Sequence, residues 1–165
     1  MTSELKAFVL RPLAAADAVP VAALIRDAFS DLPVDPDPPM SALCVTAAEI
    51  AAHLETGSGA VAEAGSQLIG SALWSERGGG LYVSRIAVTP SWRRHGLARA
   101  LIAAAESAAR RKGLPRVHLS TRLVLTGNRR LFAACGFVET AVHAHPGYAE
   151  PTFVDMEKWL SAERR

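Results

Sequence analysis

The sequence of 165 residues predicts a mixed α/β fold around one sheet, on three observations. Segments follow one another in the order strand, two helices, three strands, helix, strand, helix, two strands. One strand, at residues 81–89, carries a slip in its apolar alternation, and it leads directly into a turn that opens a long helix. Half of the residues are hydrophobic and 21% are charged, so we expect residues 1–165 to form a single compact domain.

The first strand and helix occupy the N-terminal region. Residues 8–11 are predicted to form a short strand, and Asp17 is placed to cap the helix that follows. The apolar positions of this helix recur at helical spacing and are Val21, Leu24, Ile25 and Phe29.

A proline-rich segment separates the first helix from the second. Residues 32–39 contain four prolines, which exclude a regular element. Thr46-Ala-Ala-Glu49 then has the pattern of a capping box, and Gly57 is placed to end the helix that it opens.

The remaining elements are bounded by glycine turns or by a change in periodicity. They are strands at 60–63, 67–75 and 81–89, a helix at 97–112, a strand at 117–121, a helix at 128–134, and strands at 137–142 and 152–159.

The segment 81–89 breaks the alternation expected of a half-buried strand. Large apolar residues stand at Leu81 and Val83 and then at Ile86 and Val88, so the two-residue period slips by one position. A β-bulge produces such a slip and turns backbone groups away from the neighbouring strand. A strand buried on both faces also loses alternation, and the segment alone does not decide between the two.

The turn at residues 90–98 has the features of an anion-binding helix start. The first N–H groups of a helix have no partner within it and carry partial positive charge. Gly96 lets the backbone approach a ligand, Ala98 leaves the first turn uncrowded, and Arg93 and Arg94 add positive charge. The pattern is neither a Walker loop nor a dinucleotide-binding fingerprint, and an ordinary tight turn is the alternative.

Charge, cysteine content and hydropathy exclude several classes of protein. A net charge of +2 does not favour a nucleic-acid partner, and the basic run at residues 110–112 complements the end of a helix. The two cysteines have no CxxC spacing, which is typical of a reducing compartment. Residues 1–7 lack an apolar signal region and no stretch is long enough for a membrane span. We therefore expect a cytoplasmic protein without a membrane partner.

Two adjacent motifs resemble those of the GNAT superfamily of N-acetyltransferases. Arg93-x-x-Gly96-x-Ala98 is similar to the family signature (Gln/Arg)-x-x-Gly-x-(Gly/Ala), and residues 85–90, Arg-Ile-Ala-Val-Thr-Pro, are similar to its bulged strand.

Two later motifs extend the resemblance. Residues 128–137, which begin with Asn128 and end in Gly136-Phe137, are similar to the family's helix and strand of the form Asn … Gly-Phe. Residues 145–158 resemble the ending of many bacterial members. Together the four motifs span the chain from about residue 60 onward, whereas the first third agrees in element order only.

The resemblance implies a single mixed, mostly antiparallel sheet with a splayed central strand and flanking helices, the GNAT-like acyl-CoA N-acyltransferase fold. It also implies that acetyl-CoA is the acyl donor, with its pantetheine arm paired to residues 86–88 like an added strand and its pyrophosphate held by the amides of residues 94–98. A backbone N–H near Ile86 would stabilise the tetrahedral oxyanion. The cofactor-binding residues implied are Ile86, Ala87, Val88, Arg93, Arg94, His95, Gly96, Leu97, Ala98 and Asn128.

One position departs from the family pattern. Members often carry a tyrosine four residues before the glycine of Gly-Phe, as the acid for the departing thiolate, and here that residue is Phe132. A thiol titrates near 8.5, so leaving as a thiolate at pH 7 costs only about 2 kcal/mol. An alkylamine near pKa 10.4 must first lose a proton, a cost of about 4–5 kcal/mol, so a base is the more needed group.

The candidates for proton transfer are Tyr148 and Glu63. Tyr148 lies in the last loop, which borders the acceptor cleft in the family, and the alternative is a surface tyrosine packed on the turn at Pro146. Glu63 ends a strand and could relay a proton through water, or it could simply be a solvated carboxylate. Tyr82 and Ser84 share the face of Ile86 and either line the cleft or fill the sheet.

Metal binding and thiol chemistry are not expected. His143 and His145 alternate as paired metal ligands do, but no third ligand is evident in the sequence. Cys135 has no activating partner in the sequence, which favours core packing.

The resulting prediction is transfer of an acetyl group from acetyl-CoA to a primary amine of a small molecule, an amino acid or a peptide. The alternative is a coenzyme-A-binding sensor or scaffold without turnover. The sequence leaves open the acceptor, the acid and base, the length of the acyl group, and a homodimer formed through the terminal hairpin.

Overall fold

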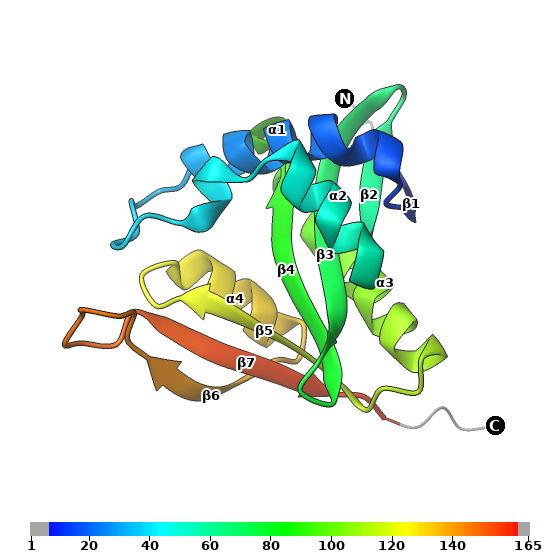
Figure 1. The fold of residues 1–165 in the computed structure, drawn as a ribbon. Coiled ribbons are helices and arrows are strands. Elements are labelled where there is room, and N and C mark those ends of the chain that lie inside the picture. The colour runs from blue at the N-terminus through cyan, green and yellow to red at the C-terminus, as the bar shows by residue number, and fades with distance from the viewer. Residues whose placement is uncertain (1–6, 162–165) are drawn as a thin grey trace, which may run out of the picture.

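The computed structural model describes residues 7–161 and places seven strands in one sheet (Figure 1). The strand order is β1-β2-β3-β4-β5-β7-β6, and β4 and β5 form the parallel pair among otherwise antiparallel neighbours. This arrangement confirms the predicted fold class. Residues 1–6, on which the expectation about a signal region rests, lie outside the described residues.

The helices and strands follow the predicted order. The predicted bounds differ from the observed ones by at most two residues, as at the start of β2, expected at 60 and found at 58. The strands are β1 Val9–Pro12, β2 Ser58–Ala64, β3 Gln67–Arg77, β4 Gly80–Val88, β5 Arg116–Arg122, β6 Val138–His143 and β7 Phe153–Trp159. The α-helices are α1 Ala18–Ser30, α2 Ala47–Thr56, α3 Leu97–Arg111 and α4 Thr126–Ala134, and short 3-10 helices lie at Ala15–Asp17, Ser41–Cys44 and Pro90–Trp92.

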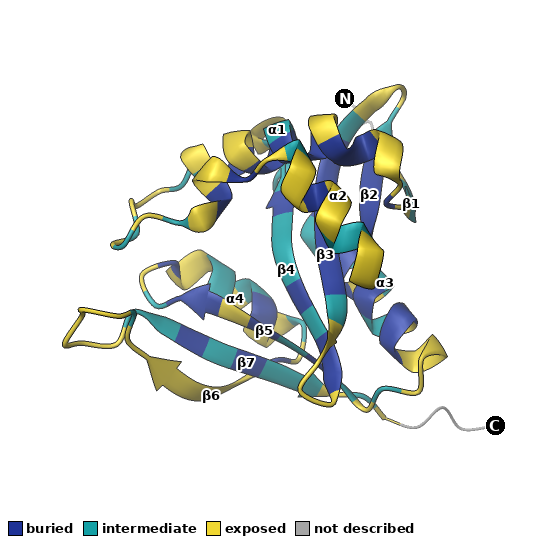
Figure 2. Ribbon diagram, in the orientation of Figure 1, coloured by how far each residue is buried: buried dark blue, intermediate teal, exposed yellow. Residues whose placement is uncertain are grey.

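Helices cover the two faces of the sheet unequally (Figure 1). One core joins α1 and α2 to β2–β4 and is centred on side chains such as Ile25 and Ile50. The other joins α3 and α4 to the opposite face and contains Leu101 and Phe132. Since α1 and α2 stop short of β5, no helix of the described residues covers the face of β5, β7 and β6 that points away from α3 (Figure 2).

A β-bulge in β4 explains the slip in the sequence pattern. Ser71 of β3 pairs with Ala87, whereas Leu73 pairs with Ser84, so β4 accommodates one extra residue over this stretch. Arg85 has a φ of 53°, the left-handed conformation that such an insertion imposes. The bulge interpretation is therefore correct, and the alternative of a regular strand buried on both faces is wrong.

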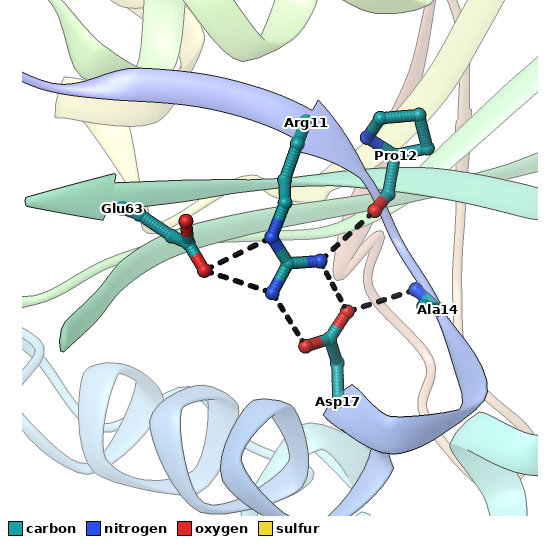
Figure 3. Close-up of polar contacts among 5 residues, drawn as sticks. All are labelled: Arg11, Pro12, Ala14, Asp17 and Glu63. Atoms are coloured by element: carbon teal, nitrogen blue, oxygen red, sulfur yellow. Dashed lines mark hydrogen bonds and ion pairs between the residues drawn. The ribbon is translucent and has the colours of Figure 1, made fainter. Parts of the chain in front are cut away.

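The two predicted helix caps have different outcomes. Thr46 accepts a hydrogen bond from the Glu49 amide at 3.2 Å, as predicted. Asp17 precedes α1 but makes no side-chain cap bond to it, so that part of the prediction is wrong. Its carboxylate instead accepts the Ala14 amide at 2.8 Å and binds the Arg11 guanidinium at 2.7 and 2.8 Å (Figure 3). The Arg11 guanidinium, six residues earlier in the chain, competes with the helix amides and directs the carboxylate toward β1.

Candidate active site

The residues predicted to bind the cofactor come together in one cavity of about 530 Å³ between α3, α4 and the end of β4. All of them except His95 line it, and the His95 ring instead contacts Trp92, with centroids 5.9 Å apart. The structure thus gathers these residues, while their contacts with a cofactor stay a prediction. Arg99, which the sequence analysis missed, also lines the cavity, and its place in the first turn of α3 was the available signal.

The backbone between β4 and α3 has the geometry of an anion site. Arg94 and Gly96 adopt positive φ values of 64° and 78°. Gly96 is the N-cap of α3, which has no side-chain cap, so its first N–H groups are available to a ligand. Turns of this kind direct successive N–H groups into a concave surface that suits phosphate.

The two arginines of this turn have different roles. The Arg93 guanidinium donates to the carbonyl oxygens of Ala28 at 3.1 Å and Asp31 at 3.0 Å, and to the Asp31 carboxylate at 2.9 Å. It therefore ties the turn to the C-terminal end of α1. Arg94 is exposed and forms no ion pair within residues 7–161, so it is the freer of the two cations.

The sheet opens beside this cavity. β4 and β5 pair only at Leu81–Val117 and Tyr82–His118, and beyond that point they diverge. A second cavity of about 340 Å³ occupies the divergence and shares Ile86, Asn128 and Phe132 with the cofactor-side cavity. The bulge of β4 therefore lies between the two.

The third cavity is a polar hollow of about 600 Å³ on the uncovered face of β5, β7 and β6. It shares Met40, Ser41, Tyr82, Ser120 and Thr121 with the cavity in the divergence. The three cavities thus adjoin one another in a row from the anion-binding turn, past the opening in the sheet, to the polar hollow.

The hollow contains a histidine in a defined protonation state. His118 Nε2 lies 2.8 Å from the Arg77 carbonyl oxygen, which can only accept, so Nε2 carries the proton. Burial lowers the pKa of His118, the hydrogen bond to the Arg77 carbonyl oxygen opposes this effect, and the positive charges of Arg116 and Arg77 lower the pKa further against a small opposing effect from Asp155. The imidazole is therefore neutral at pH 7 with its lone pair on Nδ1, and its ring lies 5.2 Å from that of Tyr82. The sequence analysis missed His118 because only the pairing of β4 with β5 places it beside Tyr82.

Neither of the two predicted proton-transfer residues lines these cavities, although Tyr148 neighbours His145 of the polar hollow, with ring centroids 6.4 Å apart. Glu63 on β2 accepts from the Arg11 guanidinium at 2.9 Å (Figure 3) and lines none of the three cavities. Tyr148 donates to the Asp37 carboxylate at 2.5 Å, an interaction that raises the pKa of Tyr148. Tyr148 thus ties the last loop to the proline-rich loop and does not line the cavities either.

Phe132 is buried and its ring packs edge-on against Phe137, with centroids 6.1 Å apart. It lines both the cofactor-side cavity and the divergence, where the family's tyrosine would stand. Burial raises the pKa of the nearby Cys135 thiol, which makes this cysteine a poor nucleophile.

The two histidines with the spacing of metal ligands, His143 and His145, contact other side chains. His143 Nε2 lies 2.6 Å from Asp155, and His145 Nδ1 contacts the Thr152 hydroxyl. Within the described part of the chain, no three His, Cys, Asp or Glu side chains are grouped as metal ligands would be. No helix among residues 7–161 has the length and apolar character that crossing a membrane requires.

Comparison with known proteins identifies the family. Residues 21–137 match the acetyltransferase (GNAT) family, so the chain belongs to it. Members of this family are acetyl-CoA-dependent N-acetyltransferases, which confirms the predicted enzyme class and acyl donor. Direct comparison with curated protein sequences gives no match.

Solved structures share the whole fold at low sequence identity. The ribosomal-protein-S18-alanine N-acetyltransferase of Escherichia coli is 18% identical, with a TM-score of 0.75 over 96% of this chain and 97% of that one. The PaiA N-acetyltransferase of Thermoplasma acidophilum, in complex with coenzyme A, is 15% identical, with a TM-score of 0.73 over 93% and 99%. YncA of Salmonella typhimurium, a putative acetyltransferase with its cofactor acetyl-CoA, is 19% identical, with a TM-score of 0.71 over 96% and 97%.

Proposed function

We propose that the protein transfers the acetyl group of acetyl-CoA to the primary amine of a small molecule, an amino acid or a peptide by direct attack on the thioester. The observation that carries this proposal is that the three cavities adjoin one another at the divergence of β4 and β5. A donor in the cofactor-side cavity and an acceptor in the polar hollow would meet beside the bulge of β4.

The proposed reaction requires three changes at the meeting point. The amine nitrogen forms a bond to the thioester carbon, the carbon–sulfur bond breaks, and a proton leaves the nitrogen. A backbone N–H near Ile86 would hold the oxyanion, because the bulge frees main-chain groups on the side of the divergence.

We assign the role of base to His118, acting through water. Its unprotonated Nδ1 and its position in the hollow support the assignment. His118 pairs with Tyr82, four residues before Ile86, so about 13 Å of strand separates it from the oxyanion site. The proton would therefore have to pass from the amine to His118 along a chain of several water molecules. The thiolate then leaves without an acid at Phe132, at the modest cost of about 2 kcal/mol.

A thiol-release assay tests the function. Purified protein and acetyl-CoA are combined with polyamines, amino acids, aminoglycosides and peptides with free N-termini. Peptides belong in this panel because one protein of the same fold acts on the alanine of a ribosomal protein. Release above background with at least one amine is expected, and background rates with every class would contradict the proposal.

The histidine assignment has its own test. In His118→Gln, kcat/KM should fall by about 100-fold at pH 7, and the additional steepness of the wild-type pH profile below pH 6.5, where His118 becomes protonated, should vanish, which leaves only the fall caused by protonation of the amine. If the pH profile of His118→Gln matched that of the wild type, a residue other than His118 would have to be the base.

The second candidate is a coenzyme-A-binding module without turnover, and the buried Phe132 favours it. Calorimetric binding of acetyl-CoA without thiol release would select this alternative. A homodimer through the β6–β7 hairpin also stays a prediction, supported by the exposure of the whole edge strand β6. Light scattering after size exclusion would measure it.

A further inference from the structure

The acidic and basic side chains of the polar hollow differ in their partners. Its two acids, Asp155 and Glu157, both contact neighbouring side chains. Glu157 pairs with Arg116 at 3.1 Å, and Asp155 accepts from Ser120 at 2.7 Å while its other oxygen lies 2.6 Å from His143. Glu157 is therefore neutralised by an ion pair, and both oxygens of Asp155 already have a hydrogen-bond partner.

Arg122, in contrast, is a buried cation that forms no ion pair with any residue in the range 7–161. Its residue is 9% exposed, and its guanidinium donates to the carbonyl oxygens of Pro38 at 2.7 Å and Pro39 at 3.5 Å. Carbonyl oxygens satisfy N–H groups but leave the net charge unneutralised. Burial lowers the pKa of Arg122, yet a guanidinium stays charged in proteins.

The other titratable groups around Arg122 do not neutralise it by contact. Asp37 of the proline-rich loop acts on it through space, but the Asp37 carboxylate accepts the Tyr148 hydroxyl. On the side of the last loop, His145 faces the same guanidinium, and burial and then the charge of Arg122 lower the pKa of His145. A monovalent anion entering the hollow would supply the missing charge.

Arg122 is level with the site of reaction along the sheet, on the far side of the divergence of β4 and β5. Counting from the Tyr82–His118 pair and allowing for the one-residue bulge, Arg122 stands level with Ala87, next to Ile86. Arg77, the other cation of the hollow with no ion pair among the described residues, lies toward the opposite end. Its guanidinium is 4.8 Å from the Tyr82 ring, and Tyr82 pairs with His118, about 13 Å along β5 from Arg122.

We propose that the acceptor is an amino acid or a similar amine with a nearby carboxylate, and that Arg122 binds that carboxylate. The inference rests on the proposed function, because it places the acceptor in the polar hollow. One buried cation balances one negative charge, which favours a carboxylate over a doubly charged phosphate.

Product binding tests the inference without requiring turnover. N-acetyl amino acids and their C-terminal amides are titrated calorimetrically into the coenzyme-A-bound protein, so that differences in amine pKa play no part. The acid should bind about tenfold more tightly than its amide or better, and Arg122→Gln should abolish that preference. Arg122→Lys should keep part of it.

Two further variants test whether the preference for the acid depends on the charge at Arg122 and not on other charges of the hollow or of the proline-rich loop. Arg77→Gln removes the other unpaired cation and should leave the preference intact. Asp37→Asn removes the competing negative charge and should strengthen the preference for the acid.

Equal binding of acid and amide to the wild-type protein, or a preference that survives in Arg122→Gln, would overturn the inference. The outcomes distinguish it from the proposed function. Selective binding without thiol release would retain the carboxylate site and reject the transfer, whereas thiol release with no preference for acids would do the reverse.

Discussion

Gly96 supplies the backbone conformation on which the anion-binding turn depends. Its φ is +78°, and a Cβ placed there would meet no atom within 4 Å, so conformation rather than crowding selects glycine. In Gly96→Glu, a carboxylate would stand among the N–H groups meant for phosphate. We expect the affinity for acetyl-CoA, measured by calorimetry, to fall by about 100-fold or more.

The matched control is Gly96→Asn, because asparagine tolerates positive φ and carries no charge. Its affinity should fall much less. If Gly96→Glu bound acetyl-CoA with wild-type affinity, the proposal that this turn binds the phosphate would be wrong.

Asp17 gives the first strand and helix a stability that depends on pH. Hydrogen bonds from Arg11 lower the pKa of Asp17 against the opposing effect of burial. A lowered pKa in the folded state stabilises the protein above the unfolded pKa, near 3.9, and this contribution is lost as the pH falls through the folded value. Asp17→Asn should therefore lower the free energy of unfolding by about 2 kcal/mol at pH 7 and progressively less below pH 4, measured in urea.

Asp31→Asn provides the comparison, since the Asp31 side chain is 62% exposed and its ion pair with Arg93 is correspondingly weak. Its effect should stay below about 0.5 kcal/mol. A constant difference between wild type and Asp17→Asn from pH 7 to pH 3 would contradict the assignment.

Local sequence predicts backbone features of single residues better than it predicts side-chain partners. Thr46 and Gly96 follow from their own neighbourhoods in the chain. Tyr148 and Glu63 were interpreted from their places in predicted elements, but their partners Asp37 and Arg11 are 111 and 52 residues away. Nothing in the local pattern indicates such contacts.

Among the elements, β4 is the one whose irregularity matters most. The bulge places Arg85 at φ 53°, a conformation that is costly for β-branched residues. Arg85→Val should be less stable than Arg85→Asn by about 1–2 kcal/mol in chemical denaturation. Both variants lose the hydrogen bond from Arg85 to Ser41, so their difference isolates the backbone. Equal stabilities would show that the bulge relaxes without cost.

The bulge could be predicted because the two-residue alternation of the apolar residues in the strand shifts by one position. The divergence of β4 from β5 could not be derived in this way, because it depends on which strands become neighbours. Pairing of β4 with β5 joins residues about 36 positions apart, as Leu81 with Val117. Only the family resemblance indicated the splay.

At the scale of the whole molecule, the sheet joins two separate cores. Ile25 and Leu101 are fully buried on opposite faces. If residues 1–165 form a single domain, as predicted, Ile25→Ala and Leu101→Ala should each cost about 2–5 kcal/mol and shift one common unfolding transition. Separate transitions for the two cores, followed by fluorescence and circular dichroism, would contradict that organisation.

The polar hollow shows what sequence alone could not provide at this scale. Arg122 and Asp155 come from strands that are adjacent in the sheet, but their surroundings also include the proline-rich loop, more than 80 residues earlier in the chain. The cofactor-side cavity, in contrast, draws more than half of its lining from the continuous stretch 86–99, and about half of its lining residues were predicted. Sites made of one segment can be read from sequence, and sites assembled from many segments need the fold.

Because β4 and β5 diverge, the backbone amides of β4 can show whether acetyl-CoA is bound between the two strands. In hydrogen–deuterium exchange, amides of residues 83–88 that face the divergence should exchange quickly in the free protein, because no neighbouring strand protects them. Acetyl-CoA should slow their exchange, while the amides of Leu81 and Tyr82 stay protected in both states. The exchange rates would thus report donor binding even if the protein catalysed no transfer. Unchanged exchange at residues 83–88 would mean that acetyl-CoA binds elsewhere.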